Sequence, residues 1–163
     1  MDTMNFWMDI ALDELKKTMA LVDLLIINDE EARQLSGESS LVKAAKVIRA
    51  MGPKYLIIKK GEHGALLFHE DQVFFAPALP LEEVFDPTGA GDTFAGGFIG
   101  HIVRTKDISF ENMKTAIIVG SAMASYCVEK FGTERLREIS KADISDRIAE
   151  FVDLVNFDIK LVV

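Results

Sequence analysis

The order of apolar and polar positions along the chain predicts alternating helices and short strands. Apolar residues between positions 7 and 22 recur at helical spacing with charged residues between them, which is typical of an amphipathic helix. Short continuous apolar runs at 24–27 and 55–59 are typical of strands buried in a parallel sheet. The first elements predicted are a helix from Trp7 to Val22, a strand from Leu24 to Ile27, a helix that begins at Asp29 and ends at Gly37, and a helix from Ser39 or Ser40 to Met51.

The remainder of the chain predicts a strand, a hairpin and further helices. Gly61 and Gly64 flank a turn, and Glu70 and Asp71 form the tip of the hairpin. The elements are a strand from Tyr55 to Lys59, hairpin strands from Ala65 to Phe68 and from Gln72 to Phe75, a connection from Ala76 to Phe85, a helix from Phe94 to Val103, a helix from Phe110 to Phe131, a helix that Asp143 caps and that runs to about Asn156, and a strand from Asp158 to Val163. This order predicts an α/β layered fold, and we expect residues 1–163 to form a single domain.

Composition and charge narrow the function classes. The chain has 163 residues and a net charge of −8, which argues against a nucleic-acid or anionic-membrane partner. Its single cysteine, Cys127, lies in an apolar helical stretch, so we expect no disulfide framework and a cytoplasmic location. We expect no signal peptide and no membrane span, because the start of the chain is polar and no apolar run is long enough.

One stretch just past the middle of the chain combines two kinds of chemistry. Gly89 to Gly91 are predicted to form the turn that opens a helix, whose first N–H groups lack partners and can bind an anion. Asp92 lies in the first helical turn, where its carboxylate could take a proton. Capping of the helix by Asp92 is an alternative that needs no function. A P-loop is not completed, because Gly97 and Phe98 stand where Lys and Ser or Thr are required.

Polar residues also follow two predicted strands, at the edge of the sheet where ligands bind in open α/β folds. Asn28 ends the first strand and Glu31 lies one helical turn further on, so an amide oxygen and a carboxylate suit a hydrated Mg²⁺. The alternative is a helix cap at Asn28 with acids in the first turn. Lys59 ends the second strand and could either meet a phosphate or lie in a solvated turn.

These motifs together resemble those of one enzyme family. Asp-Pro-Thr-Gly-Ala-Gly-Asp-Thr-Phe at 86–94 resembles the signature Asp-Thr-x-Gly-Ala-Gly-Asp-x-Phe of the ribokinase-like (PfkB) carbohydrate kinases. Asn28-x-x-Glu31 after a strand is similar to a second motif of that family, and Lys59–Gly64 is similar to its strand-x-x-Gly-x-x-Gly element. The motifs stand in the family's order, which makes the resemblance more specific than any one of them.

The resemblance implies a three-layer, doubly wound, mostly parallel sheet. It also implies an ATP-dependent phosphotransferase that moves the γ-phosphate to a hydroxyl of a sugar or nucleoside. The implied site residues are the catalytic Asp92 with the N–H groups of Gly89, Ala90 and Gly91; Lys59, Gly61, Gly64 and Gly132 around the nucleotide; Asn28 and Glu31 for Mg²⁺; and Asp86 and Thr88 for a monovalent cation such as K⁺, as in some relatives. The family often has Thr where Lys59 stands, which leaves the role of Lys59 open.

The resemblance covers only the C-terminal part of the family's domain. The family's N-terminal part supplies most sugar contacts and a lid, and we expect 1–163 to lack it. We therefore expect this chain alone to be a poor kinase and to self-associate, most simply as a dimer, through unpaired strand edges. Two functions remain open, namely a kinase for a small sugar or nucleoside and a nucleotide-binding or interaction module without catalysis.

Overall fold

The structure, a computed structural model, describes residues 1–156 and 158. The predicted strand from Asp158 to Val163 lies outside the described residues, except for Asp158 itself. The chain divides into two compact units. The first contains Met1–Ala78 and Ile108–Lys114, and the second contains Leu79–Asp107 and the chain from Thr115 onward.

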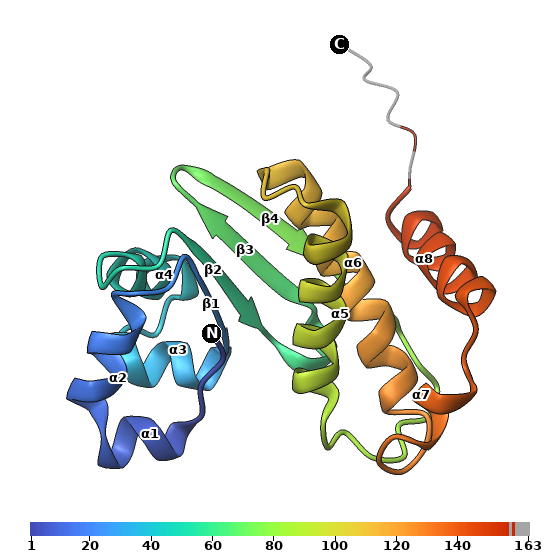
Figure 1. Ribbon diagram of the computed structural model, residues 1–163, viewed down its shortest axis with the longest axis horizontal. Coiled ribbons are helices and arrows are strands. Elements are labelled where there is room, and N and C mark those ends of the chain that lie inside the picture. The colour runs from blue at the N-terminus through green and yellow to red at the C-terminus, as the bar shows by residue number, and fades with distance from the viewer. Residues whose placement is uncertain (157, 159–163) are drawn as a thin grey trace. The chain divides into compact units, whose positions relative to one another are not determined.

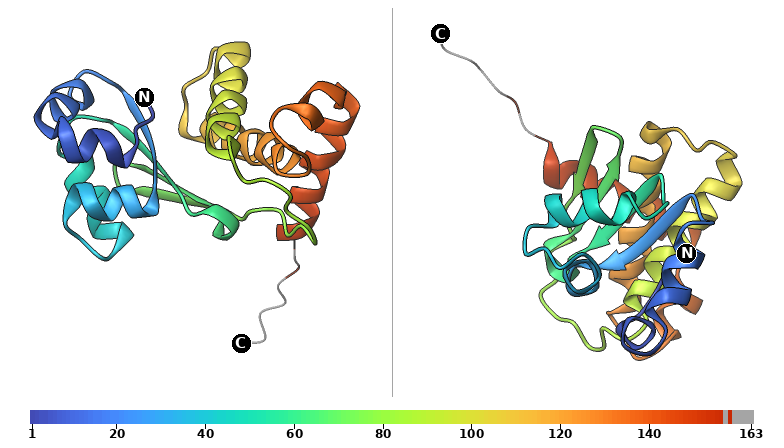
Figure 2. Two further views of the ribbon diagram at one scale, coloured as in Figure 1. Left: turned by 90° about the horizontal axis from the view of Figure 1, so that it is seen from below. Right: turned by 90° about the vertical axis from the view of Figure 1, so that its left-hand side faces the viewer.

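The first unit is built on a four-stranded sheet with the order β1-β2-β3-β4 (Figure 1). β1 (Leu24–Asn28) and β2 (Tyr55–Lys59) are parallel, and the three central residues of each are buried. β3 (Ala65–His69) and β4 (Gln72–Ala76) continue the sheet antiparallel, because the hairpin reverses the chain. The turned views show the four strands as one continuous sheet (Figure 2). The predicted α/β fold is confirmed, although among the described strands only β1 and β2 form a parallel pair.

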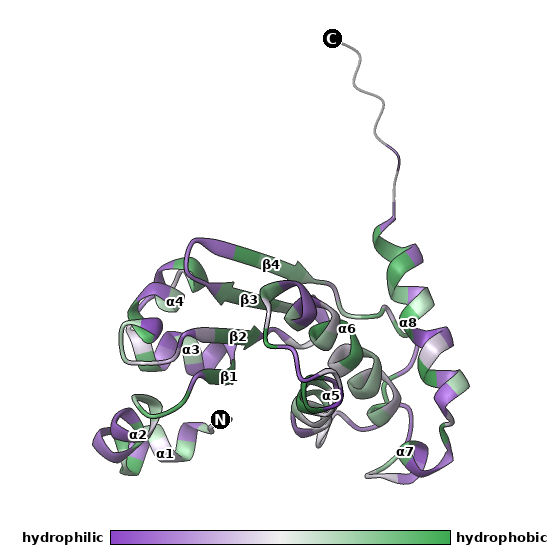
Figure 3. Cartoon of the chain, turned by 45° about the horizontal axis from the view of Figure 1, so that its top comes forward, coloured by the Kyte–Doolittle hydropathy of each residue, from purple (hydrophilic) through white to green (hydrophobic). Residues whose placement is uncertain are grey.

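Helices of the first unit cover one face of this sheet. They are α1 (Asn5–Ile10), α2 (Leu12–Met19), α3 (Asp29–Ser36) and α4 (Leu41–Arg49). A shared core joins alternate strand residues to the helices, namely Leu25, Ile27, Leu56, Ile58 and Phe68 with Met8, Leu15, Met19, Ala32, Leu35, Ala44, Ala45 and Ile48. The strands are mostly apolar with polar residues at their ends, whereas the helices alternate between apolar and polar stretches (Figure 3). Burial of the apolar residues that recur at strand and helix spacing therefore stabilises this unit.

The single helix predicted for 7–22 is wrong, because the chain leaves the helical region at Ala11, with φ −146° and ψ 41°. The break allows α1 to bury Met8, while Trp7 and Ile10 remain 47% and 62% exposed. In one continuous helix Trp7 and Ile10 were expected on the buried face. The stripe of apolar residues therefore overstated how much of this segment faces the core.

The second unit is helical. It contains α5 (Ala90–Thr105), most of α6 (Phe110–Cys127), α7 (Glu134–Glu138) and α8 (Lys141–Val155). α5 and α6 approach closely, because a Cβ on Gly120 would lie only 2.7 Å from the carbonyl oxygen of Phe94. None of the described helices combines the length and hydrophobicity needed to cross a bilayer.

Two predictions for this unit need correction. The long helix ends at Cys127 rather than Phe131. α8 is capped by Ser140, whose hydroxyl accepts from the N–H of Asp143, and Asp143 accepts in return from the N–H of Ser140. Asp143 is thus the third helical residue of a capping box rather than the cap itself.

Candidate active site

Four polar side chains gather where β1 and β2 end, and we call them the strand-end cluster: Asp2, Asn28, Glu31 and Lys59. The parallel register sets Asn28 opposite Lys59. Asp2 reaches the same edge through an isolated parallel bridge to Ile26. Lys59 Nζ lies 3.4 Å from Asp2 Oδ2. The cluster therefore holds two carboxylates and one ammonium group beside an amide.

Asn28 and Glu31 form a capping box at the start of α3. The N–H of Glu31 donates to Asn28 Oδ1, and the N–H of Asn28 donates to Glu31 Oε2, both at 2.8 Å. Glu31 is only 4% exposed, and this burial raises the pKa of its carboxyl against the lowering effects of the Asn28 N–H and of Lys59. The capping alternative is thus present as hydrogen bonds, and Glu31 Oε1 takes no part in them.

The turn after β2 depends on glycine. Gly61–His63 form a short 3₁₀ turn, and the backbone N–H of Lys60 donates to the carbonyl of Gly64 at 2.8 Å. Gly64 has φ 80° and ψ −150°, and a Cβ there would lie 2.0 Å from the carbonyl oxygen of Ala76. This backbone is open to glycine alone. The turn that follows Lys59 therefore requires glycine at position 64, where the main chain passes too close to Ala76 for a side chain.

The start of α5 exposes a carboxylate beside backbone N–H groups. Gly89 is the N-cap in the left-handed region, with φ 82°, and its carbonyl accepts from the N–H of Thr93 at 2.9 Å. The N–H of Ala90 already donates to the carbonyl of Pro87 at 3.2 Å. Helix geometry gives no intrahelical acceptor to the N–H groups of Gly91 and Asp92, so these two are open to an anion. The side chain of Asp92 is exposed in the same turn.

The loop before α5 is fastened to the end of α6. The N–H of Phe85 donates to the carbonyl of Val128 at 2.9 Å, and the N–H of Thr88 donates to Asp86 Oδ1 at 2.9 Å. The backbone and hydroxyl of Thr88, with a smaller contribution from the N–H of Gly132, lower the pKa of Asp86. The Sγ of Cys127 contacts the carbonyl oxygens of Thr88 and Gly132 at 3.8 and 3.9 Å.

The structure therefore brings the predicted site residues into three groups. Asn28, Glu31 and Lys59 meet at the strand ends, Gly61 and Gly64 lie in the turn that follows, and Asp86, Thr88, Gly89, Ala90, Gly91, Asp92 and Gly132 lie at the start of α5. Sequence analysis missed Asp2 and the contacts of Cys127 and Val128. No local signal marks them, because their partners are distant in the chain.

A comparison with protein families identifies the family of this chain. The model of the pfkB family of carbohydrate kinases matches residues 3–139. The chain belongs to the pfkB family. The resemblance stated from the sequence motifs is therefore confirmed, and its match includes the strand-end cluster apart from Asp2, the glycine turn and the start of α5.

Relatives and solved structures of the pfkB family agree with this. A cytidine kinase of Thermococcus kodakarensis is 33% identical over 131 residues, which are 79% of this chain and 41% of that protein. The aminoimidazole riboside kinase of Salmonella enterica, solved with aminoimidazole riboside and an ATP analogue, superposes with a TM-score of 0.75 at 27% identity. That match covers 87% of this chain and 47% of the other.

A second solved structure is that of an E. coli protein assigned as a ribokinase II, in complex with ATP and Mg²⁺. It superposes with a TM-score of 0.72 at 25% identity, and the match covers 94% of this chain and 47% of the E. coli chain. The ribokinase-like fold is thus confirmed. The chain spans less than half the length of each of these pfkB-family proteins.

Proposed function

We propose that this chain carries the nucleotide-binding and catalytic part of an ATP-dependent kinase that phosphorylates a hydroxyl group of a nucleoside or sugar. The observation that carries the proposal is the start of α5. There the open N–H groups of Gly91 and Asp92 lie in one helical turn with the exposed carboxylate of Asp92. An anion and a hydroxyl proton can both be handled at such a place.

The chemistry at α5 follows from these groups. The N–H groups and the positive end of the helix dipole stabilise charge on the phosphoryl group as it moves. Asp92 orients the acceptor hydroxyl and takes its proton. The N–H group of Ala90, which the sequence motif also assigns to the phosphate site, already donates to the carbonyl of Pro87. We therefore assign phosphate binding mainly to the N–H groups of Gly91 and Asp92.

The strand-end cluster fits Mg²⁺ held through its water ligands. Among the described residues, no three His, Cys, Asp or Glu side chains form a protein-only metal site. Mg²⁺ usually retains several waters and binds one or two carboxylates together with substrate phosphates. Glu31 and Asp2 supply such carboxylates, and Lys59 can neutralise a phosphate. When bound, the ion would neutralise phosphate charge.

Further assignments belong to the same proposal. Lys59, Gly61, Gly64 and Gly132 border the nucleotide. We assign a monovalent cation such as K⁺ to the carboxylate of Asp86 and the oxygen atoms of Thr88, which are neighbours in the loop before α5. The names of the relatives favour a ribosyl compound as the acceptor. The single buried cysteine supports a cytoplasmic location.

Glu31→Gln should weaken Mg²⁺-dependent ADP binding about 10- to 100-fold, the usual effect of losing a group that supports a metal site. The measurement is calorimetric titration of Mg·ADP into each variant. Because the pKa of Glu31 is raised, the wild-type carboxyl becomes protonated at a pH above the ordinary glutamate range. As the pH falls, the difference between wild type and Glu31→Gln should therefore begin to shrink above the ordinary glutamate range.

Glu30→Gln is the matched control, because Glu30 is an exposed acid in the same helical turn. It should bind Mg·ADP as the wild type does. Equal affinities for wild type and Glu31→Gln would remove Glu31 from the metal site and leave only its capping role. Nucleotide binding with ATP hydrolysis that no sugar or nucleoside stimulates would favour a module without transfer.

We also propose that the chain self-associates as a dimer. β1 lies at the edge of the sheet, and the described residues that pair with its outer side are Met1 and Asp2. Phe6 and Trp7 are about half exposed. Light scattering should therefore give the mass of a dimer, and Trp7→Glu should shift it toward the monomer. A wild-type chain that stays monomeric at high concentration would contradict this part of the proposal.

A further inference from the structure

Glu129, a partly buried carboxylate just beyond α6, binds arginines from two other helices. Arg147 of α8 donates to Glu129 Oε1 at 2.7 Å, and Arg135 of α7 donates to Glu129 Oε2 at 2.8 Å. The side chains are 11%, 26% and 24% exposed for Arg147, Arg135 and Glu129. Burial acts to raise the pKa of Glu129, but the hydrogen bonds from Arg147 and Arg135 outweigh it and lower that pKa. The ion network is therefore charged at neutral pH.

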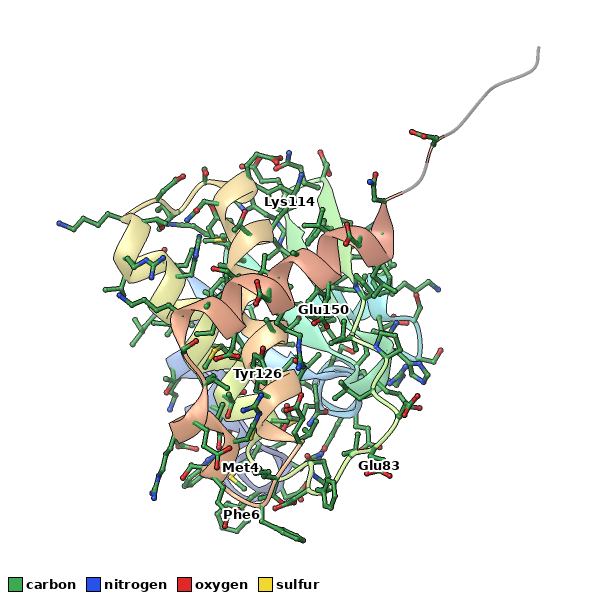
Figure 4. The ribbon with its side chains drawn as sticks, turned by 90° about the vertical axis from the view of Figure 1, so that its right-hand side faces the viewer. Met4, Phe6, Glu83, Lys114, Tyr126 and Glu150 are labelled. Carbon is green, nitrogen blue, oxygen red and sulfur yellow. The ribbon has the colours of Figure 1, made fainter. Side chains whose placement is uncertain are left out.

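Arg147 also contacts Ser125 and Tyr126 in the last turn of α6. Tyr126 is labelled in Figure 4. Arg147 Nη1 donates to Ser125 Oγ at 2.8 Å, and the guanidinium of Arg147 lies 3.9 Å from the ring centre of Tyr126. The hydroxyl of Tyr126 in turn donates to the carbonyl of Asp143 in α8 at 2.7 Å. Ser125, Tyr126 and Glu129 therefore all contact Arg147 of α8.

Cys127 and Val128, which lie between Tyr126 and Glu129, contact the loop that precedes α5. The carbonyl of Val128 accepts from the N–H groups of Phe85 and Asp86, at 2.9 and 3.4 Å. The Sγ of Cys127 contacts the carbonyl of Thr88. The segment 125–129 thus contacts the ion network through residues 125, 126 and 129, and it contacts the loop 85–88 through residues 127 and 128.

We infer that Glu129, Arg135 and Arg147 form a positioning network that fixes the end of α6 and thereby sets the loop 85–88 ahead of Gly89. This inference rests on the proposed function, because it treats that loop as the approach to the phosphate-binding start of α5. None of the three side chains needs to touch a substrate. Their effect passes through the backbone of 127–128, whose contacts hold the loop.

Amide hydrogen exchange tests the inference without any ligand. Glu129→Gln removes the charge that both arginines bind, and hydrogen bonds between charged groups are worth enough that the N–H groups of Phe85 and Asp86 should exchange about tenfold faster or more. Arg147→Lys keeps the positive charge but loses the two-armed geometry, so its effect should be intermediate. It also provides a milder variant if Glu129→Gln does not fold.

Glu150→Gln is the matched control, because the exposed Glu150 places its Oε2 3.4 Å from Nε of the same Arg147 and is not one of the groups that bind the segment 125–129 in the proposed network. Its loop amides should exchange as in the wild type. Amides inside β2 serve as the internal reference, and amides inside α8 report on the packing of that helix. A purely structural role would accelerate exchange in α8 at least as much as in the loop, and that result, or an unchanged loop, would overturn the inference.

Mg·ADP titration separates this inference from the proposed function. Glu129→Gln should bind Mg·ADP about tenfold more weakly, in proportion to the loss of loop order, while Glu150→Gln should not. If the wild-type chain binds no nucleotide but Glu129→Gln still accelerates exchange in the loop, the proposed function is refuted and the positioning role stands. A loop that does not respond refutes the positioning role whatever the nucleotide does.

Discussion

Asp92→Asn is expected to abolish phosphoryl transfer while the fold and nucleotide binding remain. Asn keeps the size of the side chain and can still accept a hydrogen bond, but it cannot take a proton from the acceptor hydroxyl. A general base contributes about 10²–10⁴-fold to the rate, so the loss should be of that order or greater. The measurement is acceptor-dependent ADP release in a form of the protein that phosphorylates a nucleoside or sugar.

The control for Asp92 is Glu111→Gln. Glu111 is likewise an acid in the first turn of a long helix, so it has the same favourable interaction with the helix dipole. Its substitution should change transfer little. If Asp92→Asn retained a rate within a few-fold of the wild type, Asp92 would be only a first-turn acid, and the proposed chemistry at α5 would lose its base.

Gly64→Ala is expected to be the most damaging single change to the first unit. Its backbone conformation is open to glycine alone, and the new Cβ would lie 2.0 Å from the carbonyl oxygen of Ala76 and 2.9 Å from Pro77. Backbone strain and overpacking together should lower the free energy of unfolding by about 2–6 kcal/mol. Urea unfolding followed by circular dichroism measures the loss.

Gly61→Ala separates this steric effect from nucleotide binding. Gly61 also has a positive φ of 55°, but a Cβ there would have open space around it. Its cost should be about 1–2 kcal/mol, so the variant stays folded and can be tested for Mg·ADP affinity. Equal destabilisation by the two substitutions would show that the contact with Ala76 gives way, contrary to the argument for Gly64.

The sheet of the first unit could be predicted because its signals are local. β1 and β2 are short apolar runs, and the hairpin β3–β4 is marked by its polar tip. The break at Ala11 could not be predicted, because neither Gly nor Pro marks it and only tertiary packing decides which apolar side chains are buried. α7 was missed for a related reason, since its five residues carry mostly charge and no apolar stripe.

The candidate site divides in the same way. Residues that lie together in sequence, such as Gly89 and Asp92, were found because one motif holds them. The ion pair of Lys59 with Asp2 and the hydrogen bond of Phe85 with Val128 join residues far apart in the chain, so no local pattern indicates them. The structure also shows Glu31 occupied in a cap while Asp92 is exposed, a difference that the sequence leaves open.

Amide NMR of this chain with Mg·ATP tests the central claim most directly, because it observes the two units separately and does not require turnover. The N–H signals of Gly91 and Asp92 should shift on titration, as expected for donors that bind phosphate, together with signals around Asn28 and Lys59. The changes should depend on Mg²⁺ and should be reduced at Asn28 in Glu31→Gln. Saturating Mg·ATP that leaves Gly91 and Asp92 unmoved, or shifts only signals elsewhere in the chain, would contradict the account.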